Sequence, residues 1–144
     1  MIEGDKLKRL KDCLDDLWAN VIDEMNIDVF NHRIVFNTKA IEDETVTNHQ
    51  LTLEEVSSFY FVENTGKDRF NLLEREEDSY LELTSIDYHP KGIGLISIKS
   101  ETKEWVKQYI SNSNFSIEIW NSMLFVEAKR VVINDIIFDV GYPQ

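Results

Sequence analysis

The sequence predicts an α+β fold that is mainly β, in which an N-terminal amphipathic helix precedes a largely antiparallel meander forming a curved sheet, half-barrel or sandwich. Leucines recur at helical spacing over residues 5–17, and segments rich in Val, Ile, Phe, Tyr and Thr alternate with short polar turns from residue 19 onward. The 144 residues contain no linker, repeat or low-complexity tract. We therefore expect a single domain over 1–144, with a helix at 5–17 and a strand-rich body at 19–141.

The predicted helix presents one apolar stripe. Leu7, Leu10, Leu14 and Leu17 lie three or four residues apart, with charged side chains between them. This spacing places the leucines on one face that the sheet can cover. Asp5 is expected to serve as the N-cap.

A change of period after Trp18 predicts the first strand, because residues 20–29 alternate in polarity as a half-buried strand does. Asn31-His32 then separates two apolar runs, 27–30 and 33–36, and predicts a tight hairpin. Further strands are expected at 46–53, 56–62, 80–88, 93–99, 115–120, 123–129 and 131–140, with turns at 64–67, 90–92, 121–122 and 134–135. Residues 102–110 could form a short helix capped by Ser100.

The aromatic residues admit two readings. In Phe59-Tyr60-Phe61, either the two phenylalanines are buried and Tyr60 points outward, or the phenylalanines are exposed. An exposed Tyr60 beside carboxylates would suit the centre of a binding surface. Trp120 is expected in the core, because isoleucines alternate before it, whereas Trp105 could be buried or exposed.

The charge is acidic and segregated. The chain has 27 acidic and 15 basic residues, a net charge of -12. Two stretches, 12–28 and 42–63, have six carboxylates each and no Lys or Arg, and a third, 74–87, has six carboxylates against Arg75 alone. Such residues keep a protein soluble and blunt strand edges, but clustered carboxylates also create a field that attracts a basic partner.

The same charge balance argues against two classes of ligand. A phosphate backbone requires surplus Lys and Arg, and a negative membrane surface attracts basic segments, so we expect neither nucleic acid nor membrane as a partner. No run is apolar for long enough to span a membrane, and the first residues do not resemble a secretory signal. A cytoplasmic location is therefore expected. The lone Cys13 agrees, and its place on the leucine-rich helix predicts a partly buried, unreactive thiol.

No motif for catalysis or for a cofactor is present in the sequence. His32, His49 and His89 do not have the spacing of metal ligands, and neither a nucleophile elbow nor a phosphate-binding glycine loop occurs. With 27 acids, accidental carboxylate pairs are unavoidable, but nothing selects one pair. We therefore expect no catalytic residue, no metal, no cofactor and no enzymatic activity.

Several segments resemble a family of small acidic, mostly uncharacterised proteins of Gram-positive bacteria that are associated with wall-associated polymorphic toxin loci. The segments are 26–30 (NIDVF), 56–62 (VSSFYFV), 80–86 (YLELTSI), 115–125 (FSIEIWNSMLF), 127–129 (EAK) and 138–141 (FDVG). The resemblance implies an immunity-type inhibitor that binds a toxin domain. No functional residue is assigned to this chain from the resemblance.

The charge pattern is compatible with that role, because an acidic surface can occupy the basic cleft of a nuclease toxin. The partner expected is thus a basic protein. Candidate contacts are taken from the acidic stretches and the exposed aromatic: Glu74, Glu76, Glu77, Asp78, Glu54, Glu55, Tyr60, Asp23 and Glu24. Two alternatives are a small-molecule-binding or enzymatic domain with a pocket in the curved sheet, and a structural or self-associating protein.

Overall fold

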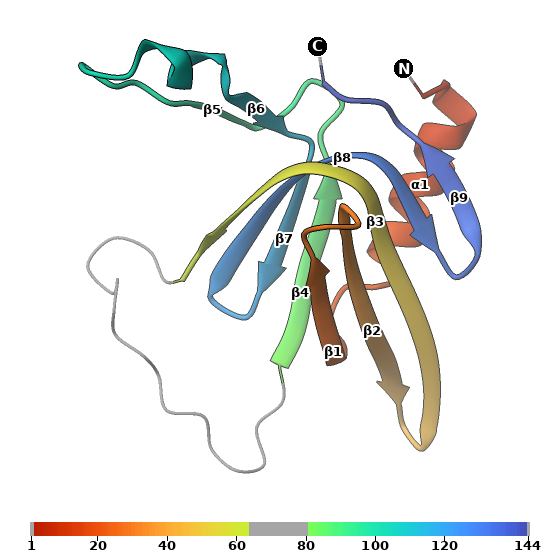
Figure 1. Ribbon diagram of the computed structural model, residues 1–144. Helices are drawn as coiled ribbons and strands as arrows, with labels where there is room; N and C mark the ends of the chain where they lie inside the picture. The colour runs from red at the N-terminus through yellow and green to blue at the C-terminus, as the bar shows by residue number, and fades with distance from the viewer. Residues whose placement is uncertain (1, 64–80, 144) are drawn as a thin grey trace.

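The computed structural model describes residues 2–63 and 81–143, and its body is a closed six-stranded antiparallel barrel (Figure 1). The barrel strands are β1 (Asn20–Asp28), β2 (Arg33–Glu42), β3 (Thr45–Val62), β4 (Leu81–Tyr88), β7 (Phe115–Ile119) and β8 (Ser122–Ile133). They follow the order β3-β2-β1-β4-β7-β8, and pairing of β8 with β3 closes the ring. The mainly β prediction is confirmed, and closure makes the fold more specific than the curved sheet expected.

The long strand β3 makes this closure possible because it bends. Its first part pairs with β2, and its residues from Leu51 onward pair with β8. Glu55 has a φ of 51°, and the register shifts between Val56 and Ser58. A bulge of this kind inserts an extra residue and bends a strand without reversing it. The prediction of two strands, at 46–53 and 56–62, was therefore wrong, since Glu54 and Glu55 continue the strand and the bulge follows them between Val56 and Ser58.

The inward side chains form one hydrophobic core with the helix. Inward-facing residues of the barrel strands, such as Phe36, Leu53, Ile117 and Val126, are fully buried. The predicted stripe of α1 (Gly4–Asp15) joins them, with Leu10, Leu14 and Leu17 at most 1% exposed. The helical spacing of the leucines thus gave the correct buried face.

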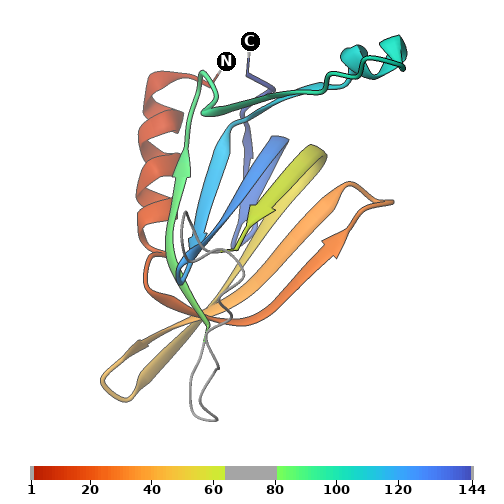
Figure 2. The same cartoon turned by 90° about the vertical axis from the view of Figure 1, so that its left-hand side faces the viewer.

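The helix lies along β4 (Figure 2). Trp18 Nε1 donates a hydrogen bond to the Ile86 carbonyl at 3.0 Å, and Ala19 N–H donates to the Leu83 carbonyl at 2.7 Å. The expected N-cap was wrong, because Glu3 occupies the N-cap position without a side-chain cap and Asp5 lies inside the first turn.

A two-stranded hairpin projects from the barrel (Figures 1 and 2). It contains β5 (Gly94–Ser97), the 3-10 helix η2 (Glu104–Gln108) and β6 (Ile110–Ser113), and we call residues 91–113 the arm. The helix expected over 102–110 is therefore shorter, and its last residue begins a strand instead. Ser100 Oγ accepts hydrogen bonds from the N–H groups of Thr102 and Lys103, which closes a turn ahead of η2 rather than capping a helix.

The C-terminal strands differ from the prediction in their boundaries. The strand β8 runs without a break through residue 130, and β9 (Ile136–Asp139) follows the predicted turn at Asn134-Asp135. Trp120 was expected in the core, but it is 51% exposed. It lies in the β7–β8 turn with a φ of 56°, where the alternation of the strand no longer directs the side chain. Trp105 is exposed as well.

Candidate protein-binding face

The aromatic segment of β3 places Tyr60 on the outside of the barrel. Tyr60 is opposite Phe125 of β8, and their rings stack with centroids 6.4 Å apart. Phe59 and Phe61 are opposite the buried Val126 and Leu124, so both point inward. Tyr60 therefore points outward and is 53% exposed, but Phe59 and Phe61 are themselves 41% and 48% exposed, so neither reading was right in full.

Cross-strand pairing extends this aromatic pair into two rows of outward side chains. One row crosses four strands as Tyr60, Phe125, Ser116 and Asp87, of which Ser116 is buried. The neighbouring row contains Val62, Met123, Glu118 and Ser85 in the same strand order. Side chains opposite each other in such rows lie close enough to form one continuous surface.

Among the residues that the structure describes, this surface carries negative charge alone. The segments that build it, 57–63, 81–88 and 115–127, contain five carboxylates and no Lys or Arg, and we call their outward side the acidic face. In the described parts of the chain, none of the five pairs with a basic side chain. The five carboxylates are Glu63, Glu82, Asp87, Glu118 and Glu127.

Glu127 has an additional structural role at the border of the acidic face. Its carboxylate accepts a hydrogen bond from Asn112 N–H at 2.6 Å and one from Ser57 Oγ at 2.5 Å. These bonds connect β8 to the base of the arm and to β3. Glu127 therefore fixes the position of the arm on the barrel.

Two predicted contact residues, Glu54 and Glu55, lie near the bulge of β3 and away from Tyr60 in the strand. Glu54 lies 4.0 Å from Arg130, and Glu55 lies 3.7 Å from Lys129. The Glu55 carbonyl also accepts a hydrogen bond from Tyr142 Oη at 2.8 Å. The structure thus brings neither carboxylate to the acidic face and places both beside cations.

The remaining predicted contacts divide into two groups. Asp23 lies at a register shift of β1 and pairs with Lys39 at 3.1 Å, and the neighbouring Glu24 is exposed on the same strand. The other group lies outside the described residues: Glu74, Glu76, Glu77 and Asp78.

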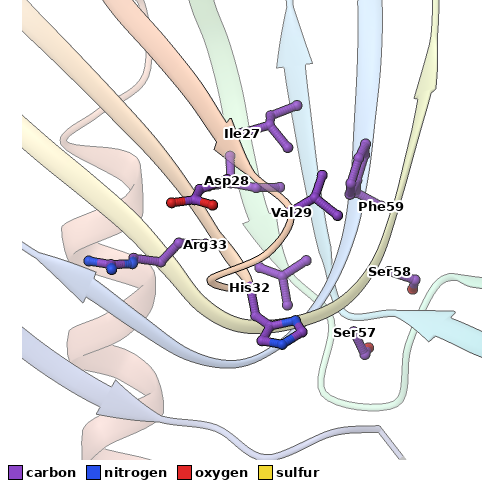
Figure 3. Close-up of a pocket in the computed structure, with 10 residues that line it drawn as sticks. Ile27, Asp28, Val29, His32, Arg33, Ser57, Ser58 and Phe59 are labelled. Carbon is purple, nitrogen blue, oxygen red and sulfur yellow. The ribbon is translucent and has the colours of Figure 1, made fainter.

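A cavity of about 390 Å³ opens at one end of the barrel, between the β1–β2 hairpin and β3, and we call this end the mouth. Val29 lies between Ile27 and Phe59, whereas the charged Asp28 and Arg33 point away from these apolar side chains (Figure 3). Asp28 instead accepts a 2.7 Å hydrogen bond from the Asn31 side chain, which lowers the pKa of its carboxyl group. The mouth thus has a mainly apolar lining, to which His32, Ser57 and Ser58 add polar groups.

Burial shifts the pKa values of several groups. Burial raises the pKa of Cys13 and that of Tyr88, and burial lowers the pKa of His89, whose Nε2 lies 2.7 Å from Ser116 Oγ. Among the described residues, no group of three or more His, Cys, Asp or Glu side chains could hold a metal ion. No helix in those same ranges is long and apolar enough to cross a membrane.

Sequence reasoning allowed an outward Tyr60 but did not place Phe125, Met123 and Glu118 beside it. The alternation of residues 115–119 and 122–128 assigns these side chains to one face of a hairpin, so part of the signal was present. What the sequence did not contain is the register between β3 and β8, which are more than 60 residues apart.

The comparisons with known proteins place the chain in a family. Residues 10–138 match a family that is described as "YxiG-like protein". A curated relative, "Uncharacterized protein YxiG" of Bacillus subtilis (strain 168), is 28% identical over 124 residues, covering 82% of this chain and 86% of that protein. The match includes every barrel strand and most of β9, and the chain therefore belongs to the YxiG-like protein family.

Proposed function

We propose that this protein is a non-catalytic immunity protein that blocks a basic toxin domain with its acidic face. The observation that supports the proposal is the stacked pair of Tyr60 and Phe125 within a surface that has five carboxylates and no basic residue. Interface centres favour aromatic side chains, and complementary charge accelerates association and rejects wrong partners. The resemblance to immunity-type proteins of toxin loci points in the same direction.

The proposed mechanism is steric and electrostatic. Tyr60 is the anchor, because its ring is supported from behind by Phe125 and has only two side-chain torsions to immobilise on binding. The carboxylates of Glu118 and Asp87 occupy positions along the same two rows and meet the basic cleft of the toxin where phosphates would otherwise bind. A toxin of the nuclease class is the partner that this chemistry fits best.

The mouth supports this proposal better than it supports a small-molecule or enzymatic site. Ligand sites combine apolar walls with a few convergent polar groups that fix orientation. Here the nearest charged side chains, Asp28 and Arg33, point away from the apolar lining. His32, Ser57 and Ser58 also line the cavity, but the Ser57 hydroxyl is hydrogen-bonded to Glu127, so few polar groups are left to orient a ligand.

The test is titration calorimetry with a panel of purified basic nuclease toxin domains. The variant Asp87→Lys/Glu118→Lys reverses two charges on the acidic face, and we expect it to weaken binding by more than about tenfold. A matched control, Glu42→Lys/Glu44→Lys, makes the same charge change at the exposed β2–β3 hairpin. Equal loss in both variants, or no loss in the first, would contradict the proposed face, and absence of binding by the parent protein would contradict the function.

A further inference from the structure

The arm exposes an unusual amount of apolar surface. Six large apolar side chains between residues 93 and 110 are 47 to 71% exposed: Ile93, Leu95, Ile98, Trp105, Tyr109 and Ile110. They belong to both strands, to η2 and to the segments around them, and the rings of Trp105 and Tyr109 pack edge to face with centroids 6.1 Å apart. Figures 1 and 2 show the arm projecting away from the barrel. Apolar side chains concentrated in this way on a projecting element mark a contact with another molecule.

The charge of the arm is opposite to that of the chain as a whole. Residues 91–113 contain four lysines and two glutamates, a net charge of +2 in a protein of net charge -12. One of the two glutamates, Glu104, pairs with Lys107. The lysines are exposed and interspersed with the apolar side chains: Lys91, Lys99, Lys103 and Lys107. A surface that suits the arm must therefore be both apolar and negatively charged.

The first turns of α1 place a second group of cations at the same end of the molecule. Residues 2–11 contain four basic and two acidic side chains. Burial and the charge of Lys11 both lower the pKa of His89, so this part of α1 lies close to the base of the arm. Figures 1 and 2 show both segments at one end of the barrel and the acidic β2–β3 hairpin at the other.

We call residues 2–11 and 91–113 together the basic end. It has 8 of the 15 basic residues and only 4 of the 27 acidic ones, a net charge of +4 that leaves -16 for the remainder of the chain. The charge of the protein is thus divided between its two ends. The expectation of no membrane partner rests on the net charge of the whole chain, which does not describe this end.

We propose that the basic end docks on an anionic lipid bilayer, with the apolar side chains of the arm inserted among the headgroups and the cations beside the lipid phosphates. Tryptophan and tyrosine favour the membrane–water interface. Lysine stems lie along apolar surface while the charge stays at the level of the headgroups. The attraction of basic segments to anionic lipids acts within a Debye length, about 8 Å at physiological salt, so the acidic residues at the opposite end do not cancel it.

Two other classes of partner fit the arm less well. Single-stranded nucleic acid stacks its bases on aromatic rings, which would leave the four exposed aliphatic side chains of the arm uncovered. A groove on a protein covers one side of a hairpin, whereas the exposed side chains come from both strands, from η2 and from the segments around them. The headgroup region of a bilayer accommodates side chains from all of these parts.

The experiment is co-sedimentation of the full chain with lipid vesicles at physiological salt. Vesicles of equal parts phosphatidylcholine and phosphatidylglycerol provide the anionic surface, and phosphatidylcholine alone provides a neutral one. The parent protein is expected to bind the anionic vesicles at least about tenfold more tightly than the neutral ones. Leu95→Asp/Trp105→Ala is expected to weaken binding to the anionic vesicles by more than about tenfold. Ile137→Asp adds the same negative charge at a similarly exposed position in β9 and is expected to bind like the parent.

The contribution of charge has its own pair of variants. Lys99→Glu/Lys103→Glu reverses two charges of the arm and is expected to weaken binding to anionic vesicles by more than about tenfold. Lys99→Arg/Lys103→Arg preserves both charges and is expected to retain binding. Circular dichroism checks that each variant is folded.

Insertion is measured with brominated lipids, which quench the fluorescence of tryptophan inside the bilayer. Quenching is expected in the parent protein and in Trp120→Phe, whose substitution lies in the β7–β8 turn, but not in Trp105→Phe. Failure of the parent to bind anionic vesicles, equal affinity for neutral vesicles, full binding by the arm variants, or preference of the arm for a single-stranded oligonucleotide would each overturn the proposal. The arm variants leave the acidic face unchanged, so the result does not depend on toxin binding.

Discussion

The carboxylates of the barrel behave differently on its two sides. Around the bulge of β3 and the β8–β9 hairpin, acidic side chains lie beside cations, as in the pairs Glu55–Lys129 and Asp139–Arg130. On the acidic face, five carboxylates have no basic neighbour in sequence or across the described strands. A cluster of acids in the sequence is thus a poor guide to a binding surface, because pairing across the sheet decides where negative charge remains uncompensated.

The two sides of the barrel meet on β8, where hydrogen bonds of the Asn114 side chain connect them. Its side chain donates to the Ala128 carbonyl at 2.8 Å and to the Gly141 carbonyl at 3.2 Å, and it accepts from Ala128 N–H at 3.0 Å. Asn114 is 1% exposed. Replacement therefore leaves buried backbone groups without partners, which costs more than the net value of the bonds themselves.

The largest predicted effect is accordingly that of Asn114→Ala. We expect a loss of about 2–4 kcal/mol in the free energy of unfolding, measured by urea denaturation. Asn121→Ala removes the same side chain from the exposed β7–β8 turn and serves as the control, with an expected change within about 0.5 kcal/mol. Equal changes in the two variants would show that the bonds of Asn114 do not join the two sides.

The second prediction separates binding from stability on the acidic face. Tyr60→Ala removes an exposed ring, so we expect little change in the unfolding midpoint but a loss of more than about tenfold in affinity for the basic partner. Trp120→Ala removes a similarly exposed ring from the nearby turn and is expected to leave affinity unchanged. Calorimetric titration measures both. A loss of affinity confined to Trp120→Ala would move the anchor to the turn.

The third prediction removes the cation Arg130, so that carboxylates on its side of the barrel become uncompensated, as they are on the acidic face. Arg130 Nε donates to Asp139 at 2.8 Å, and the same guanidinium lies 4.0 Å from Glu54. Arg130→Gln leaves these carboxylates without their cation. We expect a small decrease in thermal midpoint that disappears in 1 M salt, because exposed ion pairs are weak and screened.

The same variant tests whether uncompensated charge is sufficient for binding. Arg130→Gln increases the negative charge on the side away from Tyr60. If the acidic face is the contact surface, affinity for a basic partner rises little. A gain comparable to the loss in Asp87→Lys/Glu118→Lys would instead show that any uncompensated acid on the barrel attracts the partner.

The sequence predicted local features well because their signals are local. The leucine stripe identified the buried face of α1, and the Asn134-Asp135 pair identified the turn before β9. The bend of β3 at Glu55 and the exposure of Trp120 were missed. Both depend on a left-handed backbone conformation at a residue other than glycine, which neither composition nor alternation reveals.

The candidate face was predictable only in part for a related reason. The outward position of Tyr60 was one of two readings allowed by the alternation, and pairing with Phe125 selected it. Barrel closure likewise depends on β3 and β8 meeting, and no property of either segment alone specifies that contact. Charge runs could be counted from the sequence, but the cations Lys129 and Arg130 that compensate Glu55 and Glu54 come from a distant strand.

The smallest predicted effect is a pH dependence at the edge of the acidic face. Burial lowers the pKa of His89 in the folded protein, so the unfolded chain, with a pKa of about 6.5, binds the proton more readily. The stability contributed by neutral His89 is therefore fully present above about pH 6.5 and is lost as the pH falls toward the lower folded pKa.

Denaturation at a series of pH values should show this decline in the parent protein and a reduced decline in His89→Gln. Because His89 Nε2 lies 2.7 Å from Ser116 Oγ, Ser116→Ala should retain the decline, since burial rather than the hydroxyl lowers the pKa. An identical slope in the parent and in His89→Gln would assign the decline to the carboxylates instead.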